Sequence, residues 1–376
     1  MERALKLILL LCLAGLPFTI ARDLTVDASL TAVSGTAYPS LALAVNSLVN
    51  ASGFLVDSTN TITLLANTLT VAQIFPGHLV RGTGVESLLI QYESTPDAIT
   101  HASNCSLLPT VVLYSNSYIE IPLLKNLTIV GLNILYQGST YYNTIYSSIH
   151  VMFSRFCFNN SDPSYASSTA DIPSTYYSQI LIQSVTNVTI TNGVYLWDGL
   201  KMFTIYESHV TLSSMVFVPL STMHDKTSAA FQIYSASAAI NVNIFQTRIS
   251  CDSKVVLPMI IYVGYFNSLT MSGYNVENCD FNGYGNKSIS LTTVYGGFKA
   301  SLDDFTFTNV TFGNNSDQVL IYLTGVKNMS VSNFQISQLM QVAMEYSYSA
   351  FLNIRDAVPI AVFYPMEMYL TNFTFD

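Results

Sequence analysis

Two neighbouring acidic residues, Asp303 and Asp304, are the paired-acid candidate for catalysis in this chain of 376 residues. Glycoside hydrolysis uses two carboxyl groups about 5 Å or roughly 7–9 Å apart. Both residues lie in an alternating, strand-like stretch, where adjacent side chains point to opposite faces. Unless a turn intervenes, the two carboxylates cannot act together. We therefore expect no catalytic residues and keep Asp303 and Asp304 as weak candidates.

Other patterns that suggest catalysis or metal binding are weak. His224 and Asp225 would suit an oriented base, but no nucleophile accompanies them. The histidines are dispersed and no C-x-x-C pair occurs, which argues against a zinc site. Arg248 is a lone cation in a strand-like stretch and is expected at the surface. We expect neither a metal nor a cofactor.

Tyrosines that follow Ile or Val recur along the chain. The pairs are Ile145-Tyr146, Ile205-Tyr206, Ile233-Tyr234, Ile261-Tyr262, Val294-Tyr295 and Ile321-Tyr322. We expect the aliphatic residue to face inward, because a buried tyrosine hydroxyl needs a partner. This predicts an outward ladder in a single register, which either binds sugars or a protein partner or only stabilises the sheet. The five candidates are Tyr206, Tyr234, Tyr262, Tyr295 and Tyr322.

A second motif follows these pairs and reads as a turn residue, usually Asn, then apolar, Ser/Thr/Asn, apolar. Its copies begin at Asn126, Asn187, His209, Asn241, Ser268 and Asn328. Short strands with period-two alternation in such a repeat predict an all-β parallel β-helix, with one coil per unit and strands about 4.8 Å apart. Asn suits the corner of each coil because it tolerates the left-handed conformation. A leucine-rich repeat or a β-sandwich array fits the motifs less well.

The N-terminal part of the chain has a different pattern. A short amphipathic helix is predicted from Leu41 to Val49, followed by a strand from Thr61 to Leu65 and the segment Leu79-Val-Arg-Gly-Thr-Gly. This order resembles the capping region of the pectin-lyase-like right-handed β-helix superfamily. The resemblance implies that the helix covers the open end of the first coil. The Tyr-, Asn- and Ser-rich composition also resembles large secreted or surface β-helix proteins of protists.

Enzymes of this superfamily mostly cut polyuronates, and the sequence departs from their patterns. The G-H-G and R-I-K segments of polygalacturonases are absent, as is the Q-D-T-L-type segment of pectin methylesterases. An anionic polymer is best bound in a positive cleft. This chain has 14 basic and 23 acidic residues, so calcium would have to bridge such a substrate.

Only 10% of the residues are charged, whereas 50% are hydrophobic. The hydrophobicity excludes intrinsic disorder, and the shortage of cations excludes a nucleic-acid partner. The long apolar run of the chain lies at its N-terminus, so a polytopic membrane protein is also excluded. A β-helix accounts for the composition, because it buries one side of nearly every strand.

The first 21 residues have the features of a secretory signal peptide. Arg3 and Lys6 precede an apolar stretch from Leu7 to Leu16, and small residues precede a cleavage point after Ala21. A short membrane anchor is the alternative. We expect a signal peptide at 1–21, a cap with the helix at 22–60 and the β-helix at 61–376. The last residues begin a further strand, so we expect a truncated chain or a coil that is open to self-assembly.

The expected mature chain retains four cysteines, an even number that predicts two disulfides with three possible pairings. They are Cys105, Cys157, Cys251 and Cys279. Ten N-x-S/T sequons also suggest export. Those at Asn126, Asn187 and Asn328 belong to the repeat and are interpreted as its by-products. We expect glycan at five loop sequons, namely Asn50, Asn104, Asn159, Asn286 and Asn314.

These observations predict a secreted or cell-surface glycoprotein without catalytic activity and without a transmembrane segment in the mature chain. Its expected role is structural or in recognition, with glycans or other surface proteins as partners. A polysaccharide lyase or glycoside hydrolase of the same superfamily is the first alternative. A subunit of an extracellular fibre is the second.

Overall fold

The computed structural model describes residues 21–76, 80–114, 120–137, 143–160, 178–197, 201–219, 229–251, 254–256, 260–282, 289–312, 318–341, 349–355 and 367–375. The predicted signal peptide up to residue 20 lies outside this part of the chain. The same is true of the expected glycan sites Asn286 and Asn314 and of the candidate pair His224 and Asp225.

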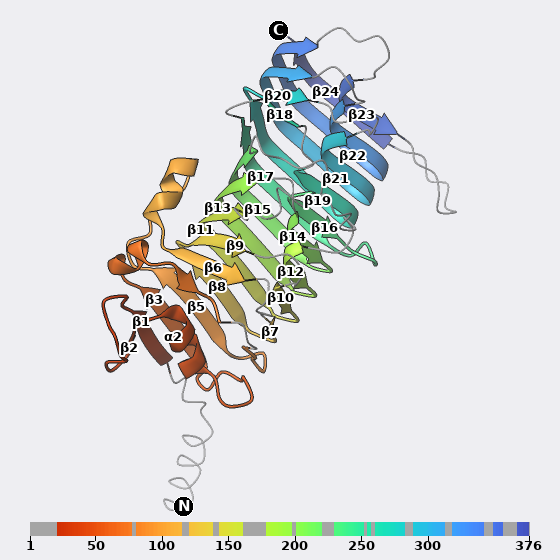
Figure 1. The fold of residues 1–376 in the computed structure, drawn as a ribbon. Helices are drawn as coiled ribbons and strands as arrows, with labels where there is room; N and C mark the ends of the chain where they lie inside the picture. The colour runs from red at the N-terminus through yellow and green to blue at the C-terminus, as the bar shows by residue number, and fades with distance from the viewer. Residues whose placement is uncertain are drawn as a thin grey trace, which may run out of the picture.

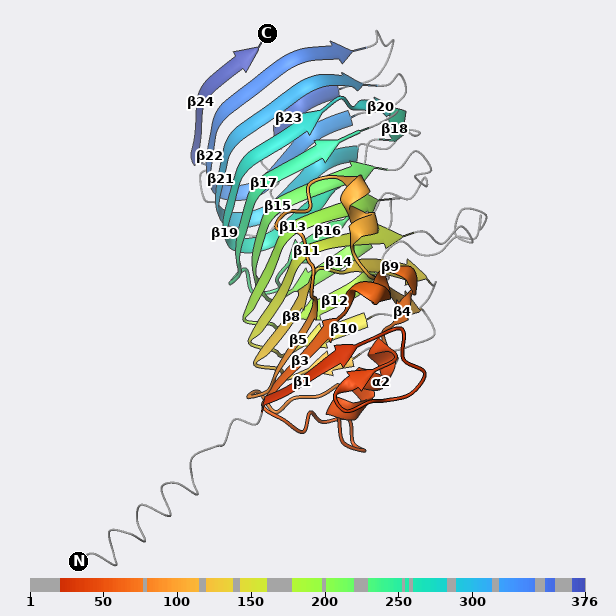
Figure 2. The same cartoon turned by 90° about the vertical axis from the view of Figure 1, so that its left-hand side faces the viewer.

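The described strands stack into a solenoid, and every pairing between them is parallel. Figures 1 and 2 show the strands lying across a long axis, with α2 at one end and β24 at the other. The predicted parallel β-helix is therefore confirmed.

Each full coil contributes strands to three sheets. The first sheet contains β7 (Glu120–Pro122), β10 (Asn143–Tyr146), β12 (Ser178–Gln183), β14 (Lys201–Tyr206), β16 (Phe231–Tyr234), β23 (Ser349–Arg355) and the first parts of β19 (Ile261–Glu277), β21 (Ile289–Phe312) and β22 (Gln318–Gln341).

The second and third sheets follow it along each coil. The second sheet contains β1 (Ala21–Val26), β3 (Thr59–Leu64), β5 (Ser87–Tyr92), β8 (Asn126–Val130), β24 (Glu367–Phe375), the middle of β19, β21 and β22, and the first parts of β11 (His150–Asn160), β13 (Asn187–Trp197), β15 (His209–Pro219) and β17 (Asn241–Ser250). The third contains β4 (Gln73–Ile74), β6 (Thr110–Tyr114), β9 (Asn133–Gln137) and the later parts of the long strands.

Three short strands lie outside these sheets. β2 (Ala37–Tyr38) pairs with β1, and β18 (Lys254–Val256) pairs with β20 (Asp280–Asn282), which continues onto the end of β21.

The predicted N-terminal helix is confirmed as α2 (Leu41–Leu48). The side chain of Ser40 caps the N-terminus of this helix, and its Oγ accepts a hydrogen bond from the Leu43 amide. The buried face of the helix packs against the first coils, beside β1 and β3. The ladder itself starts at β1, ahead of the helix, because β1 pairs with β3 along its whole length. Two short 3₁₀ turns also occur, η1 (Ala66–Thr70) and η2 (Ala102–Leu107).

Inward-facing side chains form ladders that run along the axis. On the first sheet, one aliphatic rank is fully buried from β14 to β22, with Ile205, Ile233, Val263, Val294 and Leu323 in register. Aromatic rings stack in the same way between coils, as the centroids of Phe203 and Phe231 lie 5.1 Å apart. These ladders bury the apolar half of each strand.

The first corner of each coil differs from the prediction in residue type, whereas Asn192, Asn278, Asn309 and Asn333 are left-handed residues at later corners. Left-handed residues at the first corner include Leu123, Ser147, Ser184, Tyr265 and Gly325, none of them Asn. The motif asparagines start the strands that follow, usually three residues later.

The motif asparagines bond between coils instead of occupying the corner. Asn126 donates to the Ser87 hydroxyl, and Asn241 accepts from the Ser268 hydroxyl at 2.7 Å. Their register is as predicted, since Asn126, His150, Asn187 and His209 stack on one another. The physical requirement at these positions is therefore a side chain that bonds along the ladder.

Two disulfides join the four cysteines as Cys105–Cys157 and Cys251–Cys279. The first fastens η2 against β11 on the third sheet, and the second joins two successive coils. Within the described residues, no helix has the length and apolar character needed to cross a membrane.

Candidate functional site

The outward tyrosines of the first sheet form the most distinctive surface feature in the described chain. The predicted orientation holds, because the aliphatic member of each pair is buried and the tyrosine is partly exposed. The single register is wrong. Tyr206, Tyr234 and Tyr295 share one register, which has Gly264 between the last two.

Tyr262 and Tyr322 occupy the neighbouring outward register, two residues earlier, together with Gln232 and Thr293. A shift of the strand pairing by two residues keeps every side chain on its own face. The alternation of apolar and polar residues in the sequence therefore cannot distinguish the two registers. In the true register the coils from Tyr206 onward hold 28, 30, 31 and 29 residues, ending at Thr324.

The two registers merge into one continuous surface because a glycine makes room. A Cβ atom placed on Gly264 would lie 2.9 Å from Cε1 of Tyr262, so the Tyr262 ring covers the backbone of Gly264. In the register from Tyr234 to Tyr295, Gly264 has no side chain, and the ring of Tyr262 occupies the space above it. Rings of consecutive coils also touch, since the centroids of Tyr206 and Tyr234 are 4.9 Å apart.

A further aromatic residue, Tyr265, joins this surface from the corner of the coil. It has a φ of 54° and is 37% exposed, and its ring meets that of Tyr295 edge to face with centroids 5.3 Å apart. Tyr265 follows Gly264, so it is not part of an Ile-Tyr or Val-Tyr pair. We call the five residues Tyr206, Tyr234, Tyr262, Tyr265 and Tyr295 the tyrosine strip. Tyr322 lies one coil beyond it.

Four phenols of the strip have a raised pKa. Burial raises the pKa of Tyr206, Tyr234 and Tyr262 above the ordinary value for tyrosine. Nearby Tyr265 and Tyr295 raise the pKa of Tyr262 further. A hydrogen bond to Tyr295, with burial, raises the pKa of Tyr265. Tyr206, Tyr234, Tyr262 and Tyr265 therefore present uncharged aromatic rings with hydroxyl groups at physiological pH.

Glu207 borders the strip at the corner after β14. Its carboxylate accepts bonds from Ser235 Oγ at 2.7 Å, from the Ala236 amide at 2.6 Å and from Ser237 Oγ at 3.1 Å. Burial alone would raise the pKa of Glu207, but these bonds and one from Tyr206 outweigh it and lower the pKa. The acid thus fastens one coil to the next.

The weak catalytic candidates are brought to one corner but are not arranged as a pair. Asp304 is the exposed left-handed residue of the second corner, so a turn does separate it from Asp303. Asp303 Oδ1 accepts bonds of 2.7 Å from both Ser332 Oγ and Asn333 Nδ2 of the next coil. Along its register Asp303 stacks on Ser272 and Ser332, so no second acid lies one coil away.

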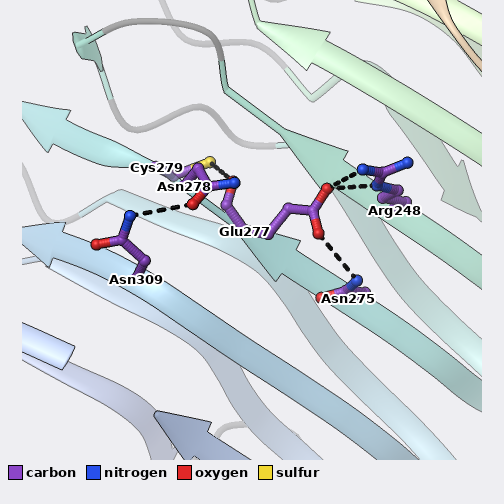
Figure 3. A network of polar contacts seen from close by, with 6 residues as sticks. All are labelled: Arg248, Asn275, Glu277, Asn278, Cys279 and Asn309. Atoms are coloured by element: carbon purple, nitrogen blue, oxygen red, sulfur yellow. Dashed lines mark hydrogen bonds and ion pairs between the residues drawn. The ribbon is translucent and has the colours of Figure 1, made fainter. Parts of the chain in front are cut away.

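Arg248 is at the surface as predicted, but it is not alone. Its guanidinium forms an ion pair with Glu277 of the next coil, and Asn275 lies on the other carboxylate oxygen (Figure 3). Asn278, which follows Glu277, is the left-handed residue of the next corner. Its Oδ1 accepts a hydrogen bond of 3.0 Å from Nδ2 of Asn309 (Figure 3). This network joins coils on the outer face of the third sheet.

Other titratable groups are scattered. Groups of three or more His, Cys, Asp or Glu side chains that could hold a metal ion do not occur among the described residues. His209 is engaged in the ladder, where its Nδ1 accepts a bond of 3.0 Å from the Asn241 amide.

The sequons differ in how their side chains are used. Asn50 and Asn104 accept backbone N–H groups through Oδ1, which leaves Nδ2, the atom that carries glycan, outside these bonds. Asn126 and Asn309 use Nδ2 to bond a neighbouring coil. Asn159, which we expected in a loop, lies inside β11 near its end.

No family model matches the sequence, and no curated protein matches it. Among solved structures, the chain is similar to the surface protein and adhesin PfbA of Streptococcus pneumoniae. The TM-score is 0.31 and the identity is 10%, over 88% of this chain and 94% of that one.

Proposed function

We propose that this protein is a non-catalytic extracellular or cell-surface β-helix whose tyrosine strip is a recognition surface. The observation that carries the proposal is the continuous row of five partly exposed rings across successive coils, from Tyr206 on β14 to Tyr295 on β21. Tyrosine is suited to recognition, because it offers a rigid apolar face and a hydroxyl at its edge.

An extracellular setting is supported by the two disulfides, since such bonds persist in oxidising compartments and are rare in the cytosol. The expected signal peptide and the sequons point the same way. The low charge of the outer strand faces suits a protein that carries glycan for solubility.

A non-catalytic role is supported by the state of the paired acids. Asp303 is bonded to Ser332 and Asn333, and its register offers no acid partner on the adjoining coils. Cleavage of polysaccharides is the competing function. Release of reducing ends or unsaturated products from a panel of neutral and acidic polysaccharides would establish it, and would have to be lost in Asp303→Asn and Asp304→Asn.

Binding of the secreted protein to an array of glycans and extracellular-matrix proteins tests the proposal. We expect binding that Tyr206→Ala combined with Tyr234→Ala abolishes. The matched control is Thr211→Ala with Asn243→Ala, which changes two outward residues of the second sheet on the adjoining coils. Equal loss in both double variants, or binding that survives in the tyrosine variant, would contradict the proposal.

A further inference from the structure

The spacing of the strip points to the class of molecule that it recognises. The rings of Tyr206 and Tyr234 are 4.9 Å apart and those of Tyr265 and Tyr295 are 5.3 Å apart, with Tyr262 between the two pairs. This repeat follows the strand spacing of about 4.8 Å, so the row runs along the axis of the solenoid. Tyr206, Tyr234, Tyr262 and Tyr295 therefore place one ring on each of four successive coils, and Tyr265 adds a second ring on the coil of Tyr262.

A polymer whose own repeat is close to that of the coils could place one of its units on each coil of the strip. An extended β-1,4-linked chain of pyranose sugars advances per sugar by a distance close to the spacing between strands, which is about 4.8 Å. The hydrophobic faces of sugar rings also stack on aromatic side chains, and the phenol hydroxyls at the ring edges can bond to sugar hydroxyls.

The charge of the surface selects among such polymers. The two outward registers of the first sheet, described from β12 to β22, contain Gln183 and Gln232 beside the tyrosines, and no Lys or Arg. Thr204 and Thr293 share these registers but are buried. The nearest charge at the corner is the carboxylate of Glu207. An anionic polymer would meet no cation in these registers and would be repelled by Glu207. Amides and phenols suit a neutral polymer.

We infer that the tyrosine strip binds a neutral, β-1,4-linked polysaccharide that lies parallel to the solenoid axis, with about one sugar on each coil. This inference rests on the proposed function, because it names the ligand of the same strip. Two specific claims follow. The carboxylate of Glu207 and the lack of cations in the two outward registers disfavour polyuronates. The match between the rise per sugar and the spacing of the coils favours the β-1,4 linkage.

Isothermal titration with three hexasaccharides tests both claims. The probes are the β-1,4-linked glucose hexamer, the α-1,4-linked glucose hexamer and the galacturonate hexamer. We expect the first to bind and the other two to bind at least tenfold more weakly. Tyr206→Ala with Tyr234→Ala should weaken the first about tenfold or more, which corresponds to 1.4 kcal/mol. Thr211→Ala with Asn243→Ala should leave it unchanged.

The outcomes separate this inference from the function on which it rests. Tyrosine-dependent binding of the galacturonate or α-linked hexamer, or of a protein on the array, would overturn the inference and leave the recognition function standing. No tyrosine-dependent binding to any hexamer or array component would overturn both. Thermal unfolding of each variant shows that a loss of binding is not a loss of fold.

Discussion

The ring of Tyr262 lies over the backbone of Gly264, so close that a methyl group on Gly264 would come within 2.9 Å of Tyr262 Cε1. This contact joins two registers of outward side chains into one aromatic surface. A side chain at residue 264 would displace the ring outward, and the strip would be interrupted between Tyr234 and Tyr295. Gly264 is therefore a positioning residue for the proposed recognition surface.

The contact predicts an interaction between substitutions at 262 and 264. In a background that carries Tyr262→Ala, Gly264→Ala should stabilise the strand by about 0.5–1 kcal/mol, because alanine loses less backbone freedom than glycine. With Tyr262 present, that gain should shrink or reverse. Urea denaturation of the four proteins in the cycle measures the coupling. Identical effects of Gly264→Ala in both backgrounds would show that the ring does not occupy this place.

The buried tyrosines of the core predict opposite responses to the loss of a hydroxyl. Tyr195 is fully buried among aromatic rings, and its hydroxyl has no hydrogen-bond partner among the described residues. Tyr274 is also buried, but its hydroxyl is 3.0 Å from Thr292 Oγ1. Tyr195→Phe should stabilise the protein by about 1 kcal/mol, whereas Tyr274→Phe should destabilise it by a similar amount.

Chemical denaturation of these two variants measures the difference directly. Both substitutions remove the same atom from an interior aromatic side chain, so each is the control for the other. A lower stability of Tyr195→Phe than of the wild type would contradict the prediction, because it would show that the Tyr195 hydroxyl makes a hydrogen bond in the folded protein.

The pH dependence of stability should reveal the role of Glu207. Because its folded-state pKa lies below the ordinary 4.5, its contribution is present above that value and is lost as the pH falls through the folded pKa. Glu207→Gln should lower the free energy of unfolding at pH 7 by at most about 1 kcal/mol, since the group is near the surface. The gap from wild type should narrow as the pH falls through the folded pKa of Glu207. A gap that stays the same at neutral and acidic pH would contradict this account.

The disulfide between coils should contribute more than any surface contact. Cys251 and Cys279 close a loop of 28 residues, and removing such a bond costs about 3 kcal/mol in the chain-entropy view. Cys251→Ser with Cys279→Ser should therefore lower the unfolding midpoint clearly, while the far-ultraviolet spectrum stays that of β-sheet. Peptide mapping without reduction should recover the pairs 105–157 and 251–279, and any other pairing would contradict the stacking order of the coils.

Glycan occupancy should follow the use of each asparagine amide. Asn50 and Asn104 should be glycosylated in the secreted protein, because their Oδ1 atoms make the local bonds. Asn126 and Asn309 should be glycosylated less, because their Nδ2 atoms bond a neighbouring coil. Glycopeptide mass spectrometry measures this order, and higher occupancy at Asn126 than at Asn50 would reverse it.

Much of the fold follows from local patterns in the sequence. Alternation with a period of two sets which residues of each strand are buried, and it places Ile205 inward and Tyr206 outward. The helix α2 follows from its apolar face and its Ser40 cap. The motif that begins at Asn126 recurs in true register, and Asn126 bonds to Ser87 of the neighbouring coil.

The features that the sequence did not predict depend on contacts between coils. Tyr262 and Tyr322 lie two residues away from the register predicted for them. The sequence does not reveal this shift, because a slip of two residues leaves each side chain on the same face of the sheet. Tyr265 was missed because its place at a corner breaks the alternation. The partner of Arg248 could be found only after the coil length was known, since Glu277 is 29 residues away and pairs diagonally.

The most direct test of the recognition surface is a footprint of the tyrosines themselves. The protein is nitrated with and without a saturating amount of the β-1,4-linked glucose hexamer, and modified peptides are quantified by mass spectrometry. We predict protection of Tyr206, Tyr234, Tyr262, Tyr265 and Tyr295, with no change at tyrosines outside the first sheet. Equal modification of the strip with and without the hexamer, or protection confined to other tyrosines, would contradict the account.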